Sequence, residues 1–552
     1  MNKRIISATL VAIPLLAMSQ TAIDAYQLSR YDLRGTARFM SMGGAFGALG
    51  GDLSTLNQNP GGIGVYRKSE IGFTLDIEMQ SSKATTPMAM NKDSQTKVYA
   101  NNFGYVGTVQ TGSDVMQSFN WGFSYNRAAS FNRRYHGTAT MNGSLSNYYA
   151  GDASKWQFSA NELVGSDDNY WNANHAPWMS ILSYNAFLIN PVGNTTQYNG
   201  MWQSGTTGIS SFDVEEKGYV DEYEINLGGN FSDVVYWGIG IGITDIDYKQ
   251  YTYYTEDMNG AIIPAQRQAT QDEMDNPTLK DYIVDGKIVD GTTTGNGGYG
   301  LDSRKHISGT GFNFKAGVIV RPINELRLGF AIHTPTYYNL TQNNDGIVDY
   351  GFGYTDGPAA PNYTGTPIEA YNWKLRTPWR MIVSAAGVIG SKAIVSLDYE
   401  YRPYQNISTK FDNGDNCTDI NGDVKDYYKA ANIIRVGAEY RLTNSVSLRA
   451  GYAYESTPTG SEVKNNELPV YTSNPYDTGT TPSYSLDNST QYITCGVGYR
   501  YKNFYADAAY VHKSRKSSFH AFTPNEYAGA TPYNASIKEN YNNIVLSIGF
   551  KF

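Results

Sequence analysis

The C-terminal stretch Ile544–Phe552, IVLSIGFKF, alternates bulky apolar residues with a smaller or polar set. Such a period of two is typical of a β-strand with one apolar face. The same rhythm recurs at 395–401, 434–442 and 446–454, where charged residues occupy the alternate positions. The charged positions include Arg435, Glu439, Arg449 and Asp398. The sequence therefore predicts strands with one oily side and one ionic side.

About fourteen segments carry this pattern, beginning after an N-terminal region of different composition. Since ladder ends are weakly marked in sequence, their bounds are approximate. The predicted strands are 69–80, 97–110, 115–129, 218–231, 234–254, 306–321, 325–340, 371–390, 392–404, 427–442, 445–455, 490–501, 504–512 and 541–552.

The predicted connections alternate between short and long. The short ones fall at 111–114, 232–233, 322–324, 391, 443–444 and 502–503, and the long polar ones include 130–217, 255–305, 341–370, 456–489 and 513–540. Outer-membrane barrels combine short periplasmic turns, long external loops and lipid-facing apolar residues at every second position. The pattern favours an all-β transmembrane antiparallel barrel over a soluble sandwich or propeller, whose outer face is polar. In that barrel the charged residues line the lumen; they are Arg435, Glu439, Arg441, Arg449, Asp398, Glu400, Arg402, Arg500 and Asp507.

Composition excludes several classes of protein. A net charge of −8 provides no basic footprint for nucleic acid. Aromatic residues make up 14% of the chain and charged residues only 17%, which argues against a disordered polyelectrolyte. The two cysteines, Cys417 and Cys495, cannot form a disulfide framework or a four-thiolate metal site.

The first residues predict export. Lys3 and Arg4 precede an apolar run over 5–17, which is followed by small and polar residues. This pattern is typical of a secretory signal peptide, and the run is too short to span a membrane. We predict a signal peptide over 1–25 with cleavage after Ala25, and cleavage after Ser19 is the alternative. A signal peptide alone would also suit a soluble periplasmic or secreted protein.

Residues 26–68 differ from the strands because they are dense in Gly and Ala, which allow close packing. They suggest a small helical plug, in which Gly43, Gly47 and Gly51 would share one side of a helix. A phosphate-binding loop is a weak alternative, since no Lys-Ser or Lys-Thr pair follows and no strand precedes.

This segment resembles the start of the FadL/TodX family of outer-membrane transporters. The likeness lies in the order and spacing of Gly35, Arg38, Gly43, Gly44, Ala45, Gly47, Asp52 and Asn59-Pro60, although Gly61 stands where the family has alanine. The resemblance implies a monomeric fourteen-stranded barrel (69–552) with an N-terminal hatch (26–68) inside the lumen. It also implies passive uptake of long-chain fatty acids or aromatic hydrocarbons, with hatch movement opening a route and lateral exit through a strand kink.

Candidate ligand-binding residues lie on the hatch and in the predicted lumen. The apolar hatch residues are Phe39, Met40, Met42, Phe46 and Leu49, which could contact a ligand or only pack. Lumen cations Arg435, Arg449 and Arg500 could pair with a carboxylate, although bracing of the wall is the simpler role. Trp156, Trp171, Trp178 and Trp202 could form an external groove or anchor their own loop.

Other chemistry receives little support. The oxygen-rich stretch 412–423 departs from the EF-hand pattern and is better explained as a solvated acidic turn than as a calcium site. The six histidines lack metal-ligand spacing, and no nucleophile elbow or HExxH helix is found. We therefore expect no catalytic residues, metal or cofactor.

The sequence as a whole predicts a bacterial outer-membrane channel for passive uptake of hydrophobic small molecules, gated by the hatch. Its expected partners are a fatty acid-like ligand, outer-membrane lipid and the barrel-assembly machinery, the last through the strand that ends in Phe552. The alternatives are a surface adhesin or antigen anchored by a barrel, and a general diffusion porin.

Overall fold

The computed structural model describes residues 21–164, 171, 176–276, 283, 286–354, 357–358, 362–390, 392–470, 478–524 and 532–552. The predicted signal peptide lies largely outside these ranges. No helix within them is long and apolar enough to cross a bilayer.

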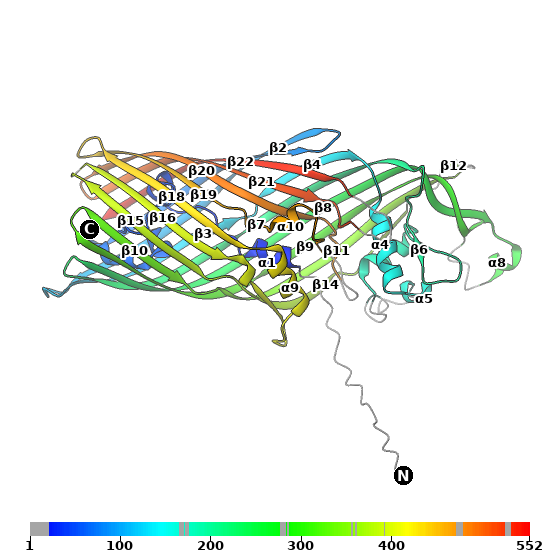
Figure 1. Ribbon diagram of the computed structural model, residues 1–552, viewed down its shortest axis with the longest axis horizontal. Coiled ribbons are helices and arrows are strands. Elements are labelled where there is room, and N and C mark those ends of the chain that lie inside the picture. Colours follow the sequence, from blue (N-terminus) through cyan, green and yellow to red (C-terminus); the bar gives the residue numbers. More distant parts are fainter. Residues whose placement is uncertain are drawn as a thin grey trace, which may run out of the picture.

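The chain forms a closed antiparallel barrel of fourteen strands, as the sequence predicted (Figure 1). Four of these strands are each built from two consecutive segments. In order they are β1 (Glu70–Thr85), β2 (Met90–Gln110), β3 (Met116–Ser130) with β4 (Arg133–Thr140), β7 (Thr207–Phe231), β8 (Val235–Gln268), β9 (Lys287–Ile323), β10 (Leu326–His333) with β11 (Tyr337–Tyr354), β14 (Glu369–Arg376) with β15 (Arg380–Ile389), β16 (Ala393–Pro403) with β17 (Ser408–Phe411), β18 (Ala430–Arg441), β19 (Val446–Glu455), β20 (Tyr484–Tyr501), β21 (Phe504–His520) and β22 (Asn534–Lys551).

The first and last strands close the barrel. β22 pairs with β1 over a continuous register from Glu70↔Lys551 to Thr85↔Ser536. Phe552 follows directly, stacks on Phe550 and leaves about half of its side chain exposed. Neither the first nor the last strand is therefore left with a free edge, as a barrel in lipid requires.

The two faces of the wall are oriented as predicted. Outward positions include Ile544 (41% exposed), Leu546 (46%) and Ile548 (53%), whereas Asp398 and Glu400 are fully buried on the lumen side. Arg435, Arg449, Arg402 and Asp507 are also buried there, but Arg441 and Arg500 lie exposed near the periplasmic turns. An apolar exterior around an ionic interior is the arrangement that a bilayer stabilises.

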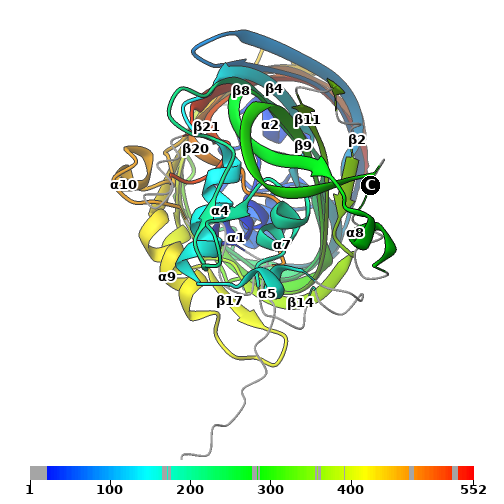
Figure 2. The same ribbon diagram turned by 90° about the vertical axis from the view of Figure 1, so that its right-hand side faces the viewer.

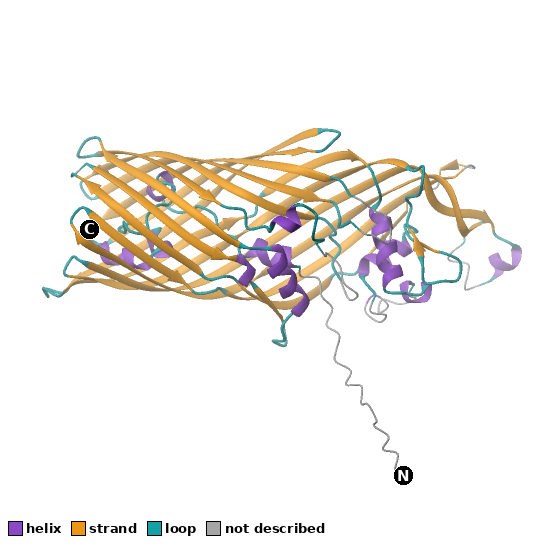
Figure 3. Cartoon of the chain, viewed as in Figure 1, coloured by secondary structure: helices purple, strands orange, loops and turns teal. Residues whose placement is uncertain are grey.

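The hatch lies inside the barrel near its short-turn end (Figure 3). It comprises α2 (Ala37–Ser41), α3 (Thr55–Gln58) and the 3₁₀ helix η1 (Pro60–Val65), and α1 (Ala22–Leu28) overlaps its first residues. The predicted helix carrying Gly43, Gly47 and Gly51 is wrong. α2 ends at Ser41, and the glycines form turns with positive φ at Gly43 and Gly51 because the chain folds back against the wall.

The far end of the barrel extends well beyond the apolar belt. The predicted loop 255–305 is wrong over most of its length, because β8 and β9 continue as one paired ladder through Gln268↔Lys287. Likewise β11 continues through Tyr354, and β1 and β2 form a hairpin over 81–96. Outside the membrane both faces of a strand can be polar, so the alternation that marks a spanning segment is lost.

A helical lid covers this end, with α4 (Leu145–Lys155), α5 (Ala160–Leu163) and α7 (Trp178–Asn185) lying across the barrel opening (Figure 2). Small strands β5 (Asn190–Pro191) and β6 (Tyr198–Asn199) complete it, while α8 (Gln271–Asp275), β12 (Gly357–Pro358) and β13 (Asn362–Gly365) belong to the outer loops. Trp171 and Trp178 are buried with ring centroids 5.6 Å apart. They anchor the lid, whereas Trp156 is 41% exposed.

Three neighbouring strands are interrupted at the same height. β10 and β11 are separated by Thr334–Thr336, β15 and β14 by Thr377–Trp379, and β16 and β17 by the 3₁₀ helix η3 (Tyr404–Asn406). Pro335, Pro378 and Pro403 lie at these breaks, and proline cannot donate to a ladder. Above the breaks, α9 (Thr418–Tyr427) and α10 (Ser461–Lys464) cover the side of the barrel (Figure 1).

Candidate functional site

A small cavity lies in the lumen where the hatch meets the wall. Its volume is about 40 Å³, so in this closed arrangement it has room for little more than a water molecule. It is lined by hatch residues Tyr31, Asp32, Leu33, Arg34, Phe39, Ser54, Asn57 and Gln58, by Asn126, Arg127 and Ala128 of β3, and by Arg380, Arg402 and Arg435 of β15, β16 and β18.

Three guanidinium groups of the cavity converge on one carboxylate. Arg380 Nε donates to Glu400 Oε1 at 2.8 Å and Arg435 Nη2 donates to Glu400 Oε2 at 2.6 Å. Arg402 Nε also donates to Glu400. The ring of Tyr31 lies under Arg380, with 4.3 Å between the guanidinium carbon and the ring centroid. Glu455 lies 3.9 Å from Arg402 Nη1, so the three arginines face two carboxylates and keep one excess positive charge.

Part of this cluster is unpaired. Among the described residues, the buried Nη1 atoms of Arg380 and Arg435 have no hydrogen-bond partner. A buried donor without a partner costs roughly 1–3 kcal/mol, and more when it is charged. A further carboxylate beside these atoms would satisfy the donors, and the planar guanidinium fork suits that group geometrically. The cluster is therefore complementary in charge and shape to an acidic group.

Apolar side chains line the lumen on the extracellular side of the cavity. Ile246, Ile307, Leu340 and Trp373 face inward and form one buried cluster with residues of α1. Within this cluster Tyr26 of α1 stacks on Tyr428, with ring centroids 4.6 Å apart. An apolar section followed by a cationic pocket is complementary to an amphiphile with a hydrocarbon tail and an anionic head.

Charged and polar contacts hold the hatch in its seat. Asp398 Oδ2 accepts from the backbone N–H groups of Phe46 (3.0 Å) and Gly47 (2.9 Å), and from Gln58 Nε2 (3.0 Å). Ion pairs join Arg38 to Glu439, Arg34 to Asp76 and Glu78, and Asp32 to Lys513. These contacts tie the hatch to β1, β16, β18 and β21.

The wall beside the cavity is interrupted. The ladder between β2 and β3 ends at Asn102↔Asn126, although β2 continues toward Met90 in its pairing with β1. The register between β3 and β7 shifts at Arg127/Ala129, and the strand resumes as β4 after two residues. Asn126, Arg127 and Ala128 line the cavity at this break. The side chain of Asn132 donates to Tyr99 Oη at 2.8 Å across the interval.

The candidate ligand-binding residues occupy different environments. Phe39 and Arg435 line the cavity. Met40, Met42, Phe46 and Leu49 are buried in a cluster with wall residues such as Val545. Arg449 pairs with Glu439 and Asp507, each at 2.6 Å, and Arg500 lies exposed at the periplasmic end of β20. The structure thus brings only two of the eight candidates into the cavity.

The motif residues of the hatch make close contacts. A side chain at Gly43 would meet the backbone of Tyr452, so this position requires glycine, whereas at Gly47 the obstacle to a Cβ atom is the side chain of Ser384. Asn59 Nδ2 donates to the carbonyl of Gly47 at 2.5 Å, and Pro60 begins η1. The others are Gly35 beside Ser54, Gly44 beside Leu33, and Arg38 on Glu439.

Sequence reasoning missed Arg380 and Tyr31. Arg380 follows the Pro378-Trp379 break, where the inward and outward positions exchange, so the alternation of the preceding residues points to the wrong face. Tyr31 and its partner Arg380 lie hundreds of residues apart in the chain. Only the lumen position of Glu400 signalled that a cationic partner was needed nearby.

The oxygen-rich stretch 412–423 is divided between a turn after β17 and the first part of α9. Among the described residues, no group of three potential metal ligands gathers there or elsewhere.

Comparison with known proteins finds similar outer-membrane proteins. Residues 265–537 match the family model for outer membrane protein transport proteins (OMPP1/FadL/TodX). The long-chain fatty acid transport protein of Salmonella typhi is 22% identical over 339 residues, which cover 59% of this chain and 67% of that protein. The crystal structure of a Pseudomonas aeruginosa FadL homologue matches with a TM-score of 0.50 at 14% identity, covering 95% of this chain and 99% of that one. The toluene transporter TodX of P. putida matches with a TM-score of 0.45 at 12% identity, covering 94% and 99%.

The fold defines a plugged, fourteen-stranded β-barrel of the outer membrane. The family match and the curated relative agree with the likeness seen in the hatch motif. Over residues 265–537 the chain is similar to outer-membrane transport proteins of the FadL/TodX type.

Proposed function

We propose that this protein mediates passive uptake of hydrophobic small molecules that carry an acidic head group, with long-chain fatty acids as the model ligand. The observation that carries the proposal is the cavity at the hatch, where Arg380 and Arg435 keep unpaired buried donors behind an apolar section of lumen. The name of the Salmonella relative, a long-chain fatty acid transport protein, agrees with this ligand class.

The lumen favours such a ligand over a purely polar one. A hydrocarbon tail gains roughly 25 cal/mol for each Å² of apolar surface removed from water. The inward apolar residues around α1 supply that surface, and the guanidinium pair supplies the polar contact for the head group. Binding of the carboxylate beside Tyr31 would compete with the packing of the hatch segment on Arg380. Ligand entry and hatch release are thereby coupled.

Release is proposed through the side of the barrel. The break between β3 and β4 adjoins the cavity, and the β2–β3 ladder is absent on its extracellular side. A lipophilic ligand that leaves there enters the bilayer and avoids water. The contacts of Tyr99 with Asn132, Ser130 and Arg127 must then separate.

The alternatives receive less support. A general porin needs an open aqueous lumen, whereas the hatch and the lid fill this one. An adhesin would present its binding residues outward, whereas the lid packs its apolar residues inward on a core shared with the barrel. We propose that the protein is monomeric and has no catalytic activity, in keeping with the channels that it resembles.

The test compares the uptake of oleate with that of oleyl alcohol by liposomes containing the protein. Arg380→Gln/Arg435→Gln removes the unpaired donors. We expect oleate uptake to fall by about tenfold, the equivalent of one charge-assisted contact, and alcohol uptake to remain unchanged. The control Arg441→Gln/Arg500→Gln removes the same charge at exposed positions near the periplasmic turns, away from the cavity. Equal loss for both ligands would contradict the assigned role of the arginines, and wild-type uptake no faster than that of empty liposomes would contradict uptake itself.

A further inference from the structure

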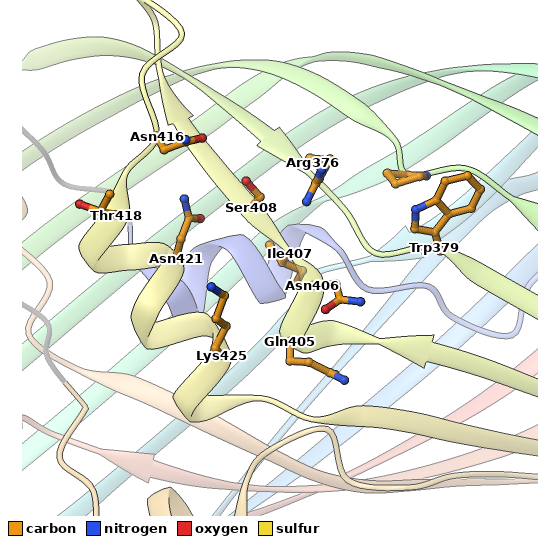
Figure 4. A pocket seen from close by; sticks show the side chains of 11 residues that line it. Arg376, Trp379, Gln405, Asn406, Ile407, Ser408, Asn416, Thr418, Asn421 and Lys425 are labelled. Carbon is orange, nitrogen blue, oxygen red and sulfur yellow. The ribbon is translucent and has the colours of Figure 1, made fainter.

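A second cavity lies on the outside of the barrel, between α9 and the interrupted strands. Its volume is about 460 Å³, more than ten times that of the luminal cavity. Side chains from β14, η3, β17 and α9 surround it (Figure 4). The lining residues are Pro335, Arg376, Trp379, Gln405, Asn406, Ile407, Ser408, Asn416, Thr418, Asn421 and Lys425.

The three interrupted strands and α9 create this groove. The ladders are broken at the prolines. Beyond Pro403, β17 pairs with β14, whereas β16 pairs with β18, so the two neighbouring strands separate and leave an opening in the wall. α9 fills the interval, and its inner residues Ile420 and Val424 join the buried cluster around α1. Asn421 fixes the helix by bonding both backbone groups of Thr409. The groove is therefore framed by fixed elements.

The charge of the groove is positive. Arg376 and Lys425 line it and no carboxylate does. Within the described part of the chain, neither cation lies within 4.0 Å of a carboxylate. On the same outward face, Lys374 and Lys410 are directly opposite each other in the β14–β17 register. Like charges across a ladder are destabilising, so this face is suited to an anion.

The acidic residues of α9 lie on another side of the helix. Thr418, Asn421 and Lys425 are spaced so that they share one helical face, and all three line the groove. Asp419, Asp423 and Asp426 fall on a different face and do not line it.

The groove is at the level where the apolar belt ends. On the membrane side, β15 presents Met381 (41% exposed) and Val383 (56%) outward. On the extracellular side, the outward residues of β14 are Arg376, Lys374 and Asn372. Trp379, 40% exposed, marks the boundary, as aromatic residues do at membrane interfaces. The cavity is therefore at the height of the head groups of the outer leaflet.

We propose that this groove binds the phosphorylated head group of a glycolipid of the outer leaflet. Arg376 and Lys425 would pair with a phosphate, since guanidinium and ammonium groups are common phosphate ligands. The side-chain amides of Gln405, Asn406 and Asn416 offer donors and acceptors for sugar hydroxyls. Trp379, Pro335 and Ile407 provide apolar contact where the acyl chains begin. This site is separate from the luminal cavity and does not depend on which ligand is transported.

The experiment uses the full-length mature barrel in phosphatidylcholine nanodiscs and measures lipid binding by native mass spectrometry. The probes are bis-phosphorylated lipid A, its dephosphorylated form and phosphatidylglycerol. We expect bis-phosphorylated lipid A to bind at least about tenfold more tightly than either other lipid, one charge-assisted contact being worth about that much. Millimolar inorganic phosphate should not displace it, because phosphate alone makes neither the amide nor the apolar contacts.

The variant Arg376→Gln/Lys425→Gln should lose this preference. Lys392→Gln/Lys502→Gln, which removes two exposed cations from the periplasmic turns, should keep it. Equal affinity for lipid A and its dephosphorylated form, or for phosphatidylglycerol, would overturn the proposal, as would displacement by inorganic phosphate. The comparison of lipids on the wild-type protein decides the question even if the double variant does not fold.

Discussion

Asp398 binds the hatch to the barrel wall, so a substitution of this residue tests gating directly. Its Oδ2 accepts three hydrogen bonds at 2.9–3.0 Å, from Phe46, Gly47 and Gln58, all within the hatch. Asp398→Asn keeps the size and one acceptor oxygen but removes the charge. Since a charge-assisted bond is about twice as strong as a neutral one, each bond loses about 1 kcal/mol, and the seat about 3 kcal/mol.

That loss raises the population of the detached hatch loop by about two orders of magnitude. Single-channel recording in planar bilayers should then show frequent openings that the wild-type protein rarely has. Glu539→Gln is the matched control, because Glu539 is a fully buried wall carboxylate that bonds Arg515 and has no hydrogen bond or ion pair to the hatch. Wild-type conductance in Asp398→Asn, or equal leak in both variants, would refute the assignment of Asp398 as the seat.

Three further predictions concern the hatch and the termini. Deletion of 26–66 should convert the barrel into a steadily conducting pore; unchanged conductance would mean that this segment does not plug the lumen. Removal of Phe552 should lower the yield of heat-modifiable barrel in the outer membrane while leaving synthesis unchanged, if the last strand is read by the assembly machinery; equal yields would argue against that partner. Intact mass measurement should place the mature N-terminus at Gln20, which corresponds to the alternative cleavage after Ser19, because Thr21 caps α1 and Asp24 pairs with Lys305 at 2.8 Å; a mass that begins at Tyr26 would instead support the first prediction, cleavage after Ala25.

The sequence was most informative within the membrane. There, alternation is enforced by lipid on one side and by ionic packing on the other, so that Ile544–Phe552 or 434–442 could be assigned strand by strand. Outside the bilayer this constraint disappears. The extensions of β8 and β9, rich in Thr, Tyr and Gly on both faces, were therefore mistaken for loops.

The sites were harder to foresee. The alternation of its strand predicted that Arg435 faces the lumen. Arg380, which binds the same carboxylate, comes directly after a proline break that exchanges the faces of the strand. The luminal cavity also depends on Tyr31, which reaches it only because the hatch folds into the barrel. The outer groove arises from α9, whose sequence is acidic overall and whose one cationic face becomes apparent only when the helix packs against β17.

A reversible lock on the hatch tests gated uptake most directly. In a background with Cys417 and Cys495 replaced by serine, Gly47→Cys/Ser384→Cys places two Cβ atoms about 3.0 Å apart, close enough for a disulfide after a small shift. Oleate uptake by liposomes is then measured before and after reduction. If the hatch gates the lumen, the oxidised protein should take up oleate no faster than empty liposomes and the reduced protein should recover. Equal uptake in both states would contradict transport through the hatch.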